Sequence, residues 1–546
     1  MMHHLETKQK VIIMIAVMSG LFLAALDQTI VGTALPKILS EFNALKELSW
    51  VVTAYLLTST ITVPIAGKMS DLYGRRKLLL TGIVVFVIGS LLCGTAQNIY
   101  ELIAYRGLQG IGGGILFSTA FTIIGDLFTL RERGRWQGII GAVFGLSSLV
   151  GPLLGGYFTD AHSFFGITTS WRWAFLINVP VGIAAFGLIA RYLPTFISKK
   201  NEVVDYLGAG LLAVTLGSLV IACSLGGTAG WEWTSFKIIG LLLTAVLGLV
   251  AFLWAELRAK DPIIPLSLFK NPVFSIICTL MLLFGVAFFG AIIYVPTFAQ
   301  QILNFSATNS GIILLPMILA LTAGSLVMGQ IVHRTGKYKV IIIAGLAVAT
   351  LGVLSLASLT TTSSYWDLAW RMAVTGIGMG MAMPMFNLAA QNTVPMEQLG
   401  VATSSVQLFR SIGATVGLAI LGGVMNNVLS QKLAGIQDQQ FVQMANQQGQ
   451  GQQFANFDIN SIQGFLSPQA QASIGHQLSA LPSQIQQTTT NALHSFVGFL
   501  QSALASSITQ MFMISAAIMA IAFVISFFLK ETPLKHHDQP ESPIEL

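Results

Sequence analysis

Two residues of opposite charge stand inside apolar stretches of the sequence, where charges are rare. Asp27 lies in the apolar run 11–35, and Arg106 lies a few residues into the run 101–123. An ionised carboxylate at the centre of a membrane-spanning helix costs about 2.5–3.5 kcal/mol on insertion scales, so such a residue normally signals function. At about 1.5 Å per residue, Asp27 lies roughly 24 Å from one boundary and Arg106 roughly 8 Å from the other, so both share a depth. We therefore expect the two side chains to face each other.

The expected pair suits proton exchange. Burial disfavours the ionised form of a carboxyl group, whereas a neighbouring guanidinium favours it. A conformational change that alters the burial or the separation would make Asp27 bind or release a proton, which assigns Asp27 and Arg106 to proton coupling. The alternative is a fixed structural ion pair with no role in coupling.

The composition requires a membrane around the elements that hold this pair. Of the 546 residues, 54% are hydrophobic and only 9% are charged, and the mean hydropathy is +0.74. A soluble domain carries about 25% charged residues, so a soluble enzyme or a nucleic-acid-binding module is excluded. Cys93, Cys223 and Cys278 lie in apolar stretches without metal-ligand spacing, so we expect neither disulfides nor a metal site.

Fourteen apolar runs are long enough to span a bilayer as helices, because each span needs about 20 residues. The sequence therefore predicts an all-α integral membrane protein. The approximate limits of the runs are 11–35, 48–67, 78–97, 101–123, 136–158, 174–192, 206–226, 237–255, 273–299, 309–332, 339–359, 368–390, 403–426 and 505–529.

The distribution of Lys and Arg orients these spans. Most of the 28 basic residues fall in the loops on the side of the N-terminus, such as the cluster at 75–77. Cytoplasmic loops carry the excess of Lys and Arg, so both termini are predicted to be cytoplasmic in a multi-pass protein of the plasma membrane, in a bacterium the inner membrane.

An internal repeat divides the chain into two similar halves. The loop GKMSDLYGRRK at 67–77 recurs as GQIVHRTGKYK at 329–339, and Arg106 before GIGGG at 110–114 recurs as Arg371 before GIGMG at 376–380. Parallel repeats of this kind build transporters with a site between the halves. The predicted parts are a cytoplasmic N-terminus 1–10, a six-helix bundle 11–200, two inserted helices 201–260, a six-helix bundle 261–530 with a polar, partly helical and partly disordered extracellular segment 427–504, and a cytoplasmic tail 531–546.

Five motifs in order resemble the major facilitator superfamily, in particular its fourteen-span drug:proton antiporter branch. They are LDQTIVGTALPKI at 26–38, the loop at 67–77, YRGLQGIGGG at 105–114, GAVFGLSSLVGPLLGG at 141–156 and WRWAFLINVPVG at 171–182. The first motif departs from the branch at Gly32, where asparagine is more usual. The resemblance covers about residues 11–530 and implies a multidrug efflux transporter that exchanges substrate for protons.

Two of these motifs supply gating candidates. In the loop, Asp71 can sit at a helix end or pair with Arg75 or Arg76, which would form a latch that breaks when the halves rock; a solvated cluster that serves only orientation is the alternative. In 141–156, the glycines allow close helix approach and Pro152 permits a bend, and the resemblance implies that this packing seals the gate. The gating candidates are Gly67, Asp71, Gly74, Arg75, Arg76, Gly145, Gly151, Pro152, Gly155 and Gly156.

Large, adaptable side chains predict broad substrate specificity. Methionine and aromatic surfaces can remould around differently shaped apolar ligands, although any one of them can instead pack between helices. Arg410 either lines the inner cavity beside Gln407 or binds helix-end carbonyls, and the sequence leaves both open. The substrate-binding candidates are Gln109, Asn178, Phe284, Phe288, Tyr294, Met383, Asn387, Gln407 and Arg410.

The expected activity is the export of amphipathic, neutral or monocationic small molecules by a monomer, in exchange for protons. The chain contains no GxxxxGK[ST] phosphate-binding loop, and no HExxH or GxSxG motif. We therefore expect no cofactor and no enzyme activity. Two alternatives are the export of a lipid, siderophore or other metabolite, and a membrane sensor or scaffold without turnover.

Overall fold

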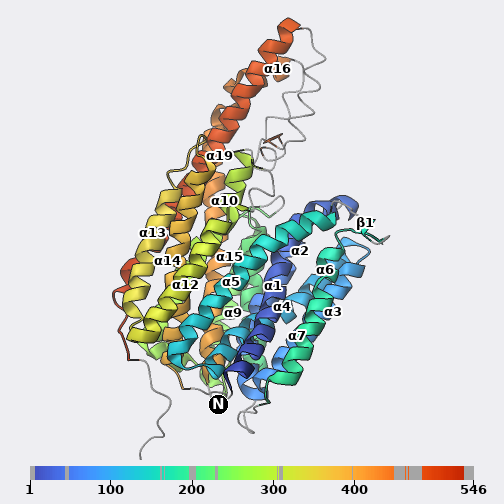
Figure 1. Ribbon diagram of the computed structural model, residues 1–546. Helices are drawn as coiled ribbons and strands as arrows, with labels where there is room; N and C mark the ends of the chain where they lie inside the picture. The colour runs from blue at the N-terminus through green and yellow to red at the C-terminus, as the bar shows by residue number, and fades with distance from the viewer. Residues whose placement is uncertain are drawn as a thin grey trace, which may run out of the picture.

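The protein is a bundle of long helices, seen here in a computed structural model (Figure 1). The structure describes residues 6–42, 48–159, 163–164, 167–195, 205–227, 231–303, 305, 312–395, 398–447, 462, 465–466 and 483–533. Its long helices are α1 (Thr7–Phe42), α2 (Leu48–Tyr73), α3 (Arg75–Thr95), α4 (Ile99–Leu127), α5 (Leu130–Thr159), α6 (Trp173–Leu176) with α7 (Asn178–Tyr192), α8 (Tyr206–Leu225), α9 (Phe236–Arg258), α10 (Pro272–Gln301), α12 (Leu315–Thr335), α13 (Lys339–Leu356), α14 (Tyr365–Asn392), α15 (Leu399–Lys432) and α19 (Ser483–Ser526).

Shorter elements complete the described part of the chain. They are the 3-10 helices η2 (Leu266–Lys270) and η4 (Leu433–Asp438), the helix α16 (Gln440–Gln447), and the strands β1 (Ser163–Phe164) and β2 (Ile167–Thr168). The two strands form an antiparallel hairpin in which Ser163 pairs with Thr168.

The helices confirm the predicted all-α membrane fold. Within the described residues, thirteen helical segments are long and apolar enough to cross a membrane. The remaining predicted span, 136–158, falls within α5, a helix of 30 residues that packs along α1 and α12. Each of the fourteen predicted spans therefore corresponds to a helix or, at 174–192, to two consecutive helices.

Several boundaries differ from the predicted ones. The span predicted at 174–192 is divided at Ile177 into α6 and α7. The span predicted at 505–529 is the second half of α19, whose 44 residues extend roughly 66 Å at 1.5 Å per residue. α19 therefore rises beyond the other helices with α16, at the top of Figure 1. The predicted segment 427–504 is helical where it is described; 448–461, 463–464 and 467–482 lie outside the described residues, as does the tail from 534.

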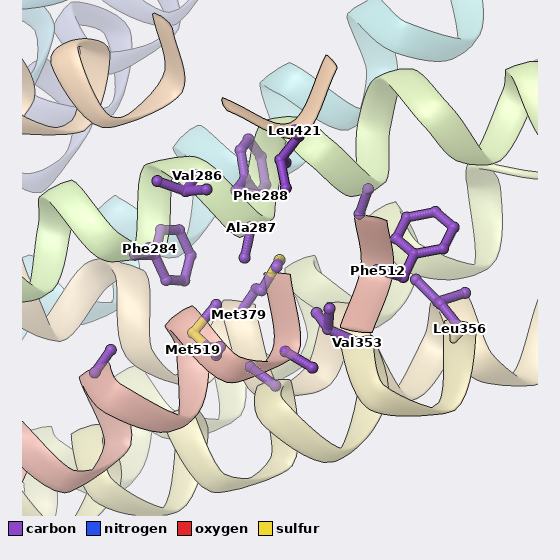
Figure 2. Close-up of a cluster of buried hydrophobic side chains, with 14 of the residues drawn as sticks. Phe284, Val286, Ala287, Phe288, Val353, Leu356, Met379, Leu421, Phe512 and Met519 are labelled. Carbon is purple, nitrogen blue, oxygen red and sulfur yellow. The ribbon is translucent and has the colours of Figure 1, made fainter. Parts of the chain in front are cut away.

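The helices form two groups with separate cores. One core joins residues of α1, α2, α3, α4, α5 and α7, and the other joins residues of α10, α12, α13, α14, α15 and α19. Figure 2 draws part of the second core, with Phe284 and Ala287 from α10, Met379 from α14, and Phe512 and Met519 from α19. The inserted helices α8 and α9 pack on each other, and α8 also contacts α2 and α15.

Glycines allow close helix packing at equivalent positions of both halves. α4 lies between α2 and α3, and α14 lies between α12 and α13. A Cβ atom on Gly112 of α4 would collide with the backbone of Phe86 in α3, and one on Gly378 of α14 would collide with the backbone of Ala349 in α13. The motifs GIGGG and GIGMG therefore allow equivalent helix approaches, which supports the internal repeat.

We predict that Gly378→Ala destabilises the protein, because the added methyl group must displace the α13 backbone. Overpacking of this kind costs about 1–3 kcal/mol. Thermal unfolding of the detergent-purified full chain measures the change in Tm. The control is Gly240→Ala on α9, where an added Cβ meets nothing within 4 Å. An unchanged Tm for Gly378→Ala would contradict the close approach of α13 and α14.

Candidate functional site

Asp27 and Arg106 form an ion pair inside the N-terminal half. Arg106 Nη1 donates to Asp27 Oδ2, and the two side chains are 2% and 0% exposed. Asp27 Oδ1 accepts two further hydrogen bonds, from Gln109 Nε2 at 2.8 Å and from Asn178 Nδ2 at 3.1 Å. The structure therefore brings together the two residues that the sequence expects to face each other; their role in coupling stays a prediction.

Local structure places these donors around the carboxylate. Asn98 caps α4, because its side chain accepts from the backbone N–H of Glu101 at 2.9 Å. Arg106 and Gln109 then fall one turn apart on one face of the helix, and Arg106 Nη1 also donates to Gln109 Oε1 at 2.7 Å. Asn178 is the first residue of α7, so the break between α6 and α7 sets its position.

Ser90 on α3 completes this network. Asn178 Nδ2 donates to Ser90 Oγ at 2.9 Å, and the Ser90 hydroxyl donates to the carbonyl oxygen of Phe175 at 2.9 Å. The carboxylate of Asp27 on α1 is therefore connected to α3, α4, α6 and α7. These hydrogen bonds hold the buried charge in position, while Asn178 Oδ1 has no partner among the described residues.

Tyr55 on α2 packs against the ion pair. The Arg106 guanidinium carbon lies 4.3 Å from the centre of the Tyr55 ring, and the buried Tyr55 hydroxyl donates to the carbonyl oxygen of Ala24 at 3.4 Å. A side-chain hydrogen bond also joins Tyr55 to Gln28. Gln28 lines the central cavity, whereas Asp27 does not. The carboxylate is thus sealed from the cavity in this conformation.

A second acid on α1, Glu41, has a pKa below its ordinary value. Glu41 Oε1 pairs with Arg172 Nη1 at 2.9 Å, and Trp171 Nε1 donates to Glu41 Oε2 at 2.8 Å. Partial burial raises the pKa of Glu41, but the hydrogen bonds and positive charges of its surroundings outweigh this effect, so the pKa lies below its ordinary value. Glu41 therefore stays ionised at neutral pH and is a poor proton carrier.

A central cavity of about 680 Å³ lies between the two halves. Its lining comes from α1, α2, α4, α5 and α8 on one side and from α10 and α15 on the other. We call the end of the bundle where α1 begins the N-side, and the opposite end the far side. The lining includes Trp233, Gly226 and Asn426 at the far-side ends of their segments, so the cavity extends toward the far side.

An adjoining cavity of about 110 Å³ continues this space toward α12 and α14. Gln28, Phe144, Phe289 and Arg410 line both cavities. Most other lining residues are apolar or carry hydroxyl groups, and neither cavity has a carboxylate in its described lining.

Of the two positions that the sequence leaves open for Arg410, the cavity beside Gln407 and the helix-end carbonyls, the structure shows the first. Arg410 lies beside Gln407 in the cavity wall, and its Nε donates to Gln407 Oε1 at 2.9 Å. Gln407 Nε2 in turn donates to Asn387 Oδ1 at 3.2 Å.

The structure brings some of the substrate-binding candidates to the cavities and keeps others away. Phe288, Tyr294, Met383, Gln407 and Arg410 line them. Phe284 does not, because it packs edge-on against Phe386 in the core, with ring centres 5.7 Å apart. Gln109 and Asn178 bind Asp27 instead, and Asn387 lies behind Gln407. These four differ from the expectation because neighbouring helices cover the faces that carry them.

Asp71 joins the two halves at the N-side. It pairs with Arg75 and accepts hydrogen bonds from the backbone N–H groups of Gly400 at 3.3 Å and Val401 at 3.1 Å. These groups belong to the first turn of α15, where the helix dipole favours a negative charge. Arg75 also donates through Nε to Asp126 Oδ2 at 2.7 Å. We call Asp71 with these two N–H groups the latch.

The residues around the latch explain its geometry. Gly74 precedes α3 with φ of 89°, a conformation that favours glycine. Gly67 lets α2 approach α15, because a Cβ there would collide with Ser404. Arg76 does not join the latch, since it donates to the carbonyl oxygen of Ala190 and to Thr195 Oγ1 at 2.9 Å.

Among the described residues, the second copy of the loop forms no comparable contact. Gly336 ends α12 with φ of 69°, and His333 and Arg334 beside it are exposed. The N-side closure is therefore asymmetric between the repeats.

Two further contacts hold the halves together. Arg133 Nη1 donates to Gln391 Oε1 at 3.2 Å on the N-side. Gly145 of α5 lies so close to α12 that a Cβ would collide with Ile318.

The other gating candidates of α5 lie within the N-terminal half. A Cβ on Gly151 would collide with Thr29 of α1, and Gly155 is buried. α5 continues through Pro152 and Gly156, whose contacts lie outside the described part of the structure.

Sequence reasoning misses several residues of these sites. Tyr55, Ser90 and Asp126 carry no local signal, because only the packing of α2, α3 and α4 gives them their partners. The amide donors of Gly400 and Val401 belong to the backbone, and a predicted helix start near a glycine would have been the available hint. Arg133 lies in a basic loop whose charges the sequence assigns to orientation alone.

Comparisons with known proteins agree with this architecture. The sequence matches the family model of the Major Facilitator Superfamily over residues 17–418. It is 38% identical to the multidrug transporter protein MdtP of Bacillus subtilis, over 98% of this chain and 96% of that protein. It is 33% identical to multidrug resistance protein 3 of the same organism, over 96% of each chain. The crystal structure of the human organic anion transporter MFSD10 shares the fold, with a TM-score of 0.58 at 13% identity, over 93% of this chain and 99% of that one.

The family, the spans and the fold lead to one conclusion. The protein is a multi-pass membrane protein whose relatives are transporters rather than enzymes. Its resemblance by motif is confirmed over most of its length. The chain belongs to the Major Facilitator Superfamily of membrane transporters.

Proposed function

We propose that the protein exports amphipathic small molecules in exchange for protons, by alternating access between its two halves. One observation carries the proposal, namely the carboxylate of Asp27, which is buried against Arg106 and does not line the cavity between the halves, although the next residue, Gln28, does. A carboxylate in this position can exchange a proton only when the helices move, which is what coupling requires. The named function of the relatives MdtP and multidrug resistance protein 3 supports the choice of substrates.

The expected orientation assigns a direction to this state. The excess of Lys and Arg in the loops of the N-side predicts that this side faces the cytoplasm, with the protein in the plasma membrane. The cavity then opens outward while the latch and Arg133 close the cytoplasmic side. An outward-open state releases substrate and receives protons. One proton that moves inward through 100 mV supplies about 2.3 kcal/mol, which is enough to concentrate a substrate.

Coupling would proceed through the network around Asp27. A proton on Asp27 removes its negative charge and so weakens its hold on Arg106, Gln109 and Asn178. These groups sit on α4 and α7, and Arg106 also stacks on Tyr55 of α2. Loss of the ion pair would loosen α1 from these helices and allow the N-terminal half to tilt. Re-ionisation on the cytoplasmic side would restore the pair.

The charge of the cavity narrows the expected substrates. The sequence favours neutral or monocationic molecules. Neutral amphiphiles suit the described lining, which combines apolar side chains with hydroxyl groups. A monocation would depend on aromatic faces such as those of Trp233 and Phe289, because the described lining has no carboxylate and contains Arg410.

The alternatives are an exporter of a lipid, siderophore or other metabolite, and a membrane sensor or scaffold. A cavity between two halves that is closed only on the N-side argues for turnover, and a drug panel alongside a lipid-flipping assay separates the substrate classes. We propose a monomer, because the described lining of the cavity comes from one chain.

We predict that Asp27→Asn abolishes proton coupling, because an amide cannot release a proton at physiological pH. In proteoliposomes of the full chain with a pH-sensitive dye inside, adding substrate changes the internal pH for the unmodified protein. The expected signal of Asp27→Asn is at least about tenfold smaller. The control is Glu41→Gln, an acid on the same helix with a lowered pKa, which keeps the signal. An Asp27→Asn protein that moves protons as before would refute the coupling role.

We also predict that Asp71→Asn opens the N-side. The change removes a charged acceptor of the α15 N–H groups, and hydrogen bonds to charged groups contribute about 1.5–3 kcal/mol. Spin labels at the exposed residues Lys77 and Lys337 report the distance between the halves on this side. The fraction with a long distance should rise about tenfold or more. Asp438→Asn, at an exposed acid beyond the far side, should leave the distribution unchanged. An equal distribution in Asp71→Asn would show that the latch does not hold this side closed.

A further inference from the structure

Arg410 is the one charged residue in the described lining of both cavities. Its side chain is buried, with the residue 8% exposed, and it contacts the cavity beside Gln407. Only its Nε atom has a hydrogen-bond partner within the described part of the chain, the Oε1 atom of Gln407 at 2.9 Å. No carboxylate among the described residues pairs with it. The two terminal guanidinium nitrogens are thus left for another group.

The surroundings hold this guanidinium in place. α15 approaches α10 so closely at Gly285 that a Cβ there would collide with the Arg410 carbonyl oxygen, so the backbone of Arg410 packs directly on α10. The Arg410 guanidinium carbon lies 5.8 Å from the centre of the Phe289 ring. Behind Gln407, the fully buried Asn387 accepts a hydrogen bond through Oδ1, while its Nδ2 has no partner in the described chain. The arginine is therefore oriented by residues that do not neutralise it.

A buried cation without a counter-charge is costly, and it is stabilised by an anion that restores the pair. A guanidinium presents parallel N–H groups that match the two oxygens of a carboxylate. The walls beside it are apolar, with Phe117, Phe144 and Ile293 among them. The site thus combines one fixed positive charge with a large hydrophobic surface.

We propose that Arg410 binds the carboxylate of amphipathic monoanions, whose apolar body occupies the rest of the central cavity. The inference rests on the proposed export function and extends its substrates from neutral molecules to organic acids. Gln407 acts as a positioning residue, because it holds Nε and leaves the terminal nitrogens to the ligand. An inorganic anion such as chloride offers the same charge without the apolar body, and the experiment separates the two.

The test compares two probes that differ in one group, pyrenebutyric acid and its primary amide. Binding to the purified full chain is followed by the fluorescence anisotropy of pyrene at neutral pH, where the acid is ionised. The unmodified protein should bind the acid about tenfold more tightly than the amide, the ratio expected for one charge-assisted hydrogen-bonded pair. Arg410→Gln should lose this preference, and Arg410→Lys should retain part of it. Arg334→Gln, which removes one exposed arginine outside the cavity, should keep the full ratio.

Two results would overturn the inference. One is an unchanged preference of Arg410→Gln for the acid over the amide, where binding of the amide shows that the variant is folded. The other is equal affinity for the two probes in the unmodified protein, with chloride in place of gluconate raising Tm, which would assign the site to an inorganic anion only. Acid binding that depends on Arg410 supports the inference even if no proton flux accompanies transport, so failure of the proposed function would be seen separately.

Discussion

A bilayer offers no water to a buried charge, so an ionised group inside it must find its partners within the protein. Asp27 meets this constraint with donors from Arg106, Gln109 and Asn178, and through them it connects α1 to α4 and α7. Several helices of the N-terminal half are therefore held by one negative charge. Any process that neutralises this charge changes the interactions of several helices together, which is why a single carboxyl group can control the motion of a whole bundle.

In the C-terminal half, the buried charge of Arg410 is not neutralised by a described residue. Arg410 is oriented by Gln407 but has no described acidic partner, and it contacts the central cavity. The two halves thus divide two tasks between them. A neutralised and sealed pair is suited to respond to protons, whereas an unneutralised arginine in an apolar cavity is suited to contact a ligand.

Close helix approach connects these sites to motion. Glycines in α4 and α14 bring backbones together within each half, while Gly67 and Gly145 do so between the halves. Among the described residues, the halves meet through the latch at Asp71, the hydrogen bond of Arg133 to Gln391, and the packing of α5 on α12 and of α2 on α15. The polar contacts in this interface can break and reform at moderate cost, which suits an interface that opens on alternate sides.

The helices, the repeat and the family could be predicted from the sequence, because hydrophobic length, glycine spacing and charge placement are properties of each segment in isolation. The sequence also brought Asp27 and Arg106 to one depth, since the rise of a helix converts position along the chain into distance. Which face of each helix points inward became clear only from the packed fold. It assigned Gln109 and Asn178 to Asp27 rather than to the cavity, gave Asp71 the amides of α15, and left Arg410 facing open space. The reason is that rotation of a helix about its axis depends on the shapes of its neighbours, and no single segment contains that information.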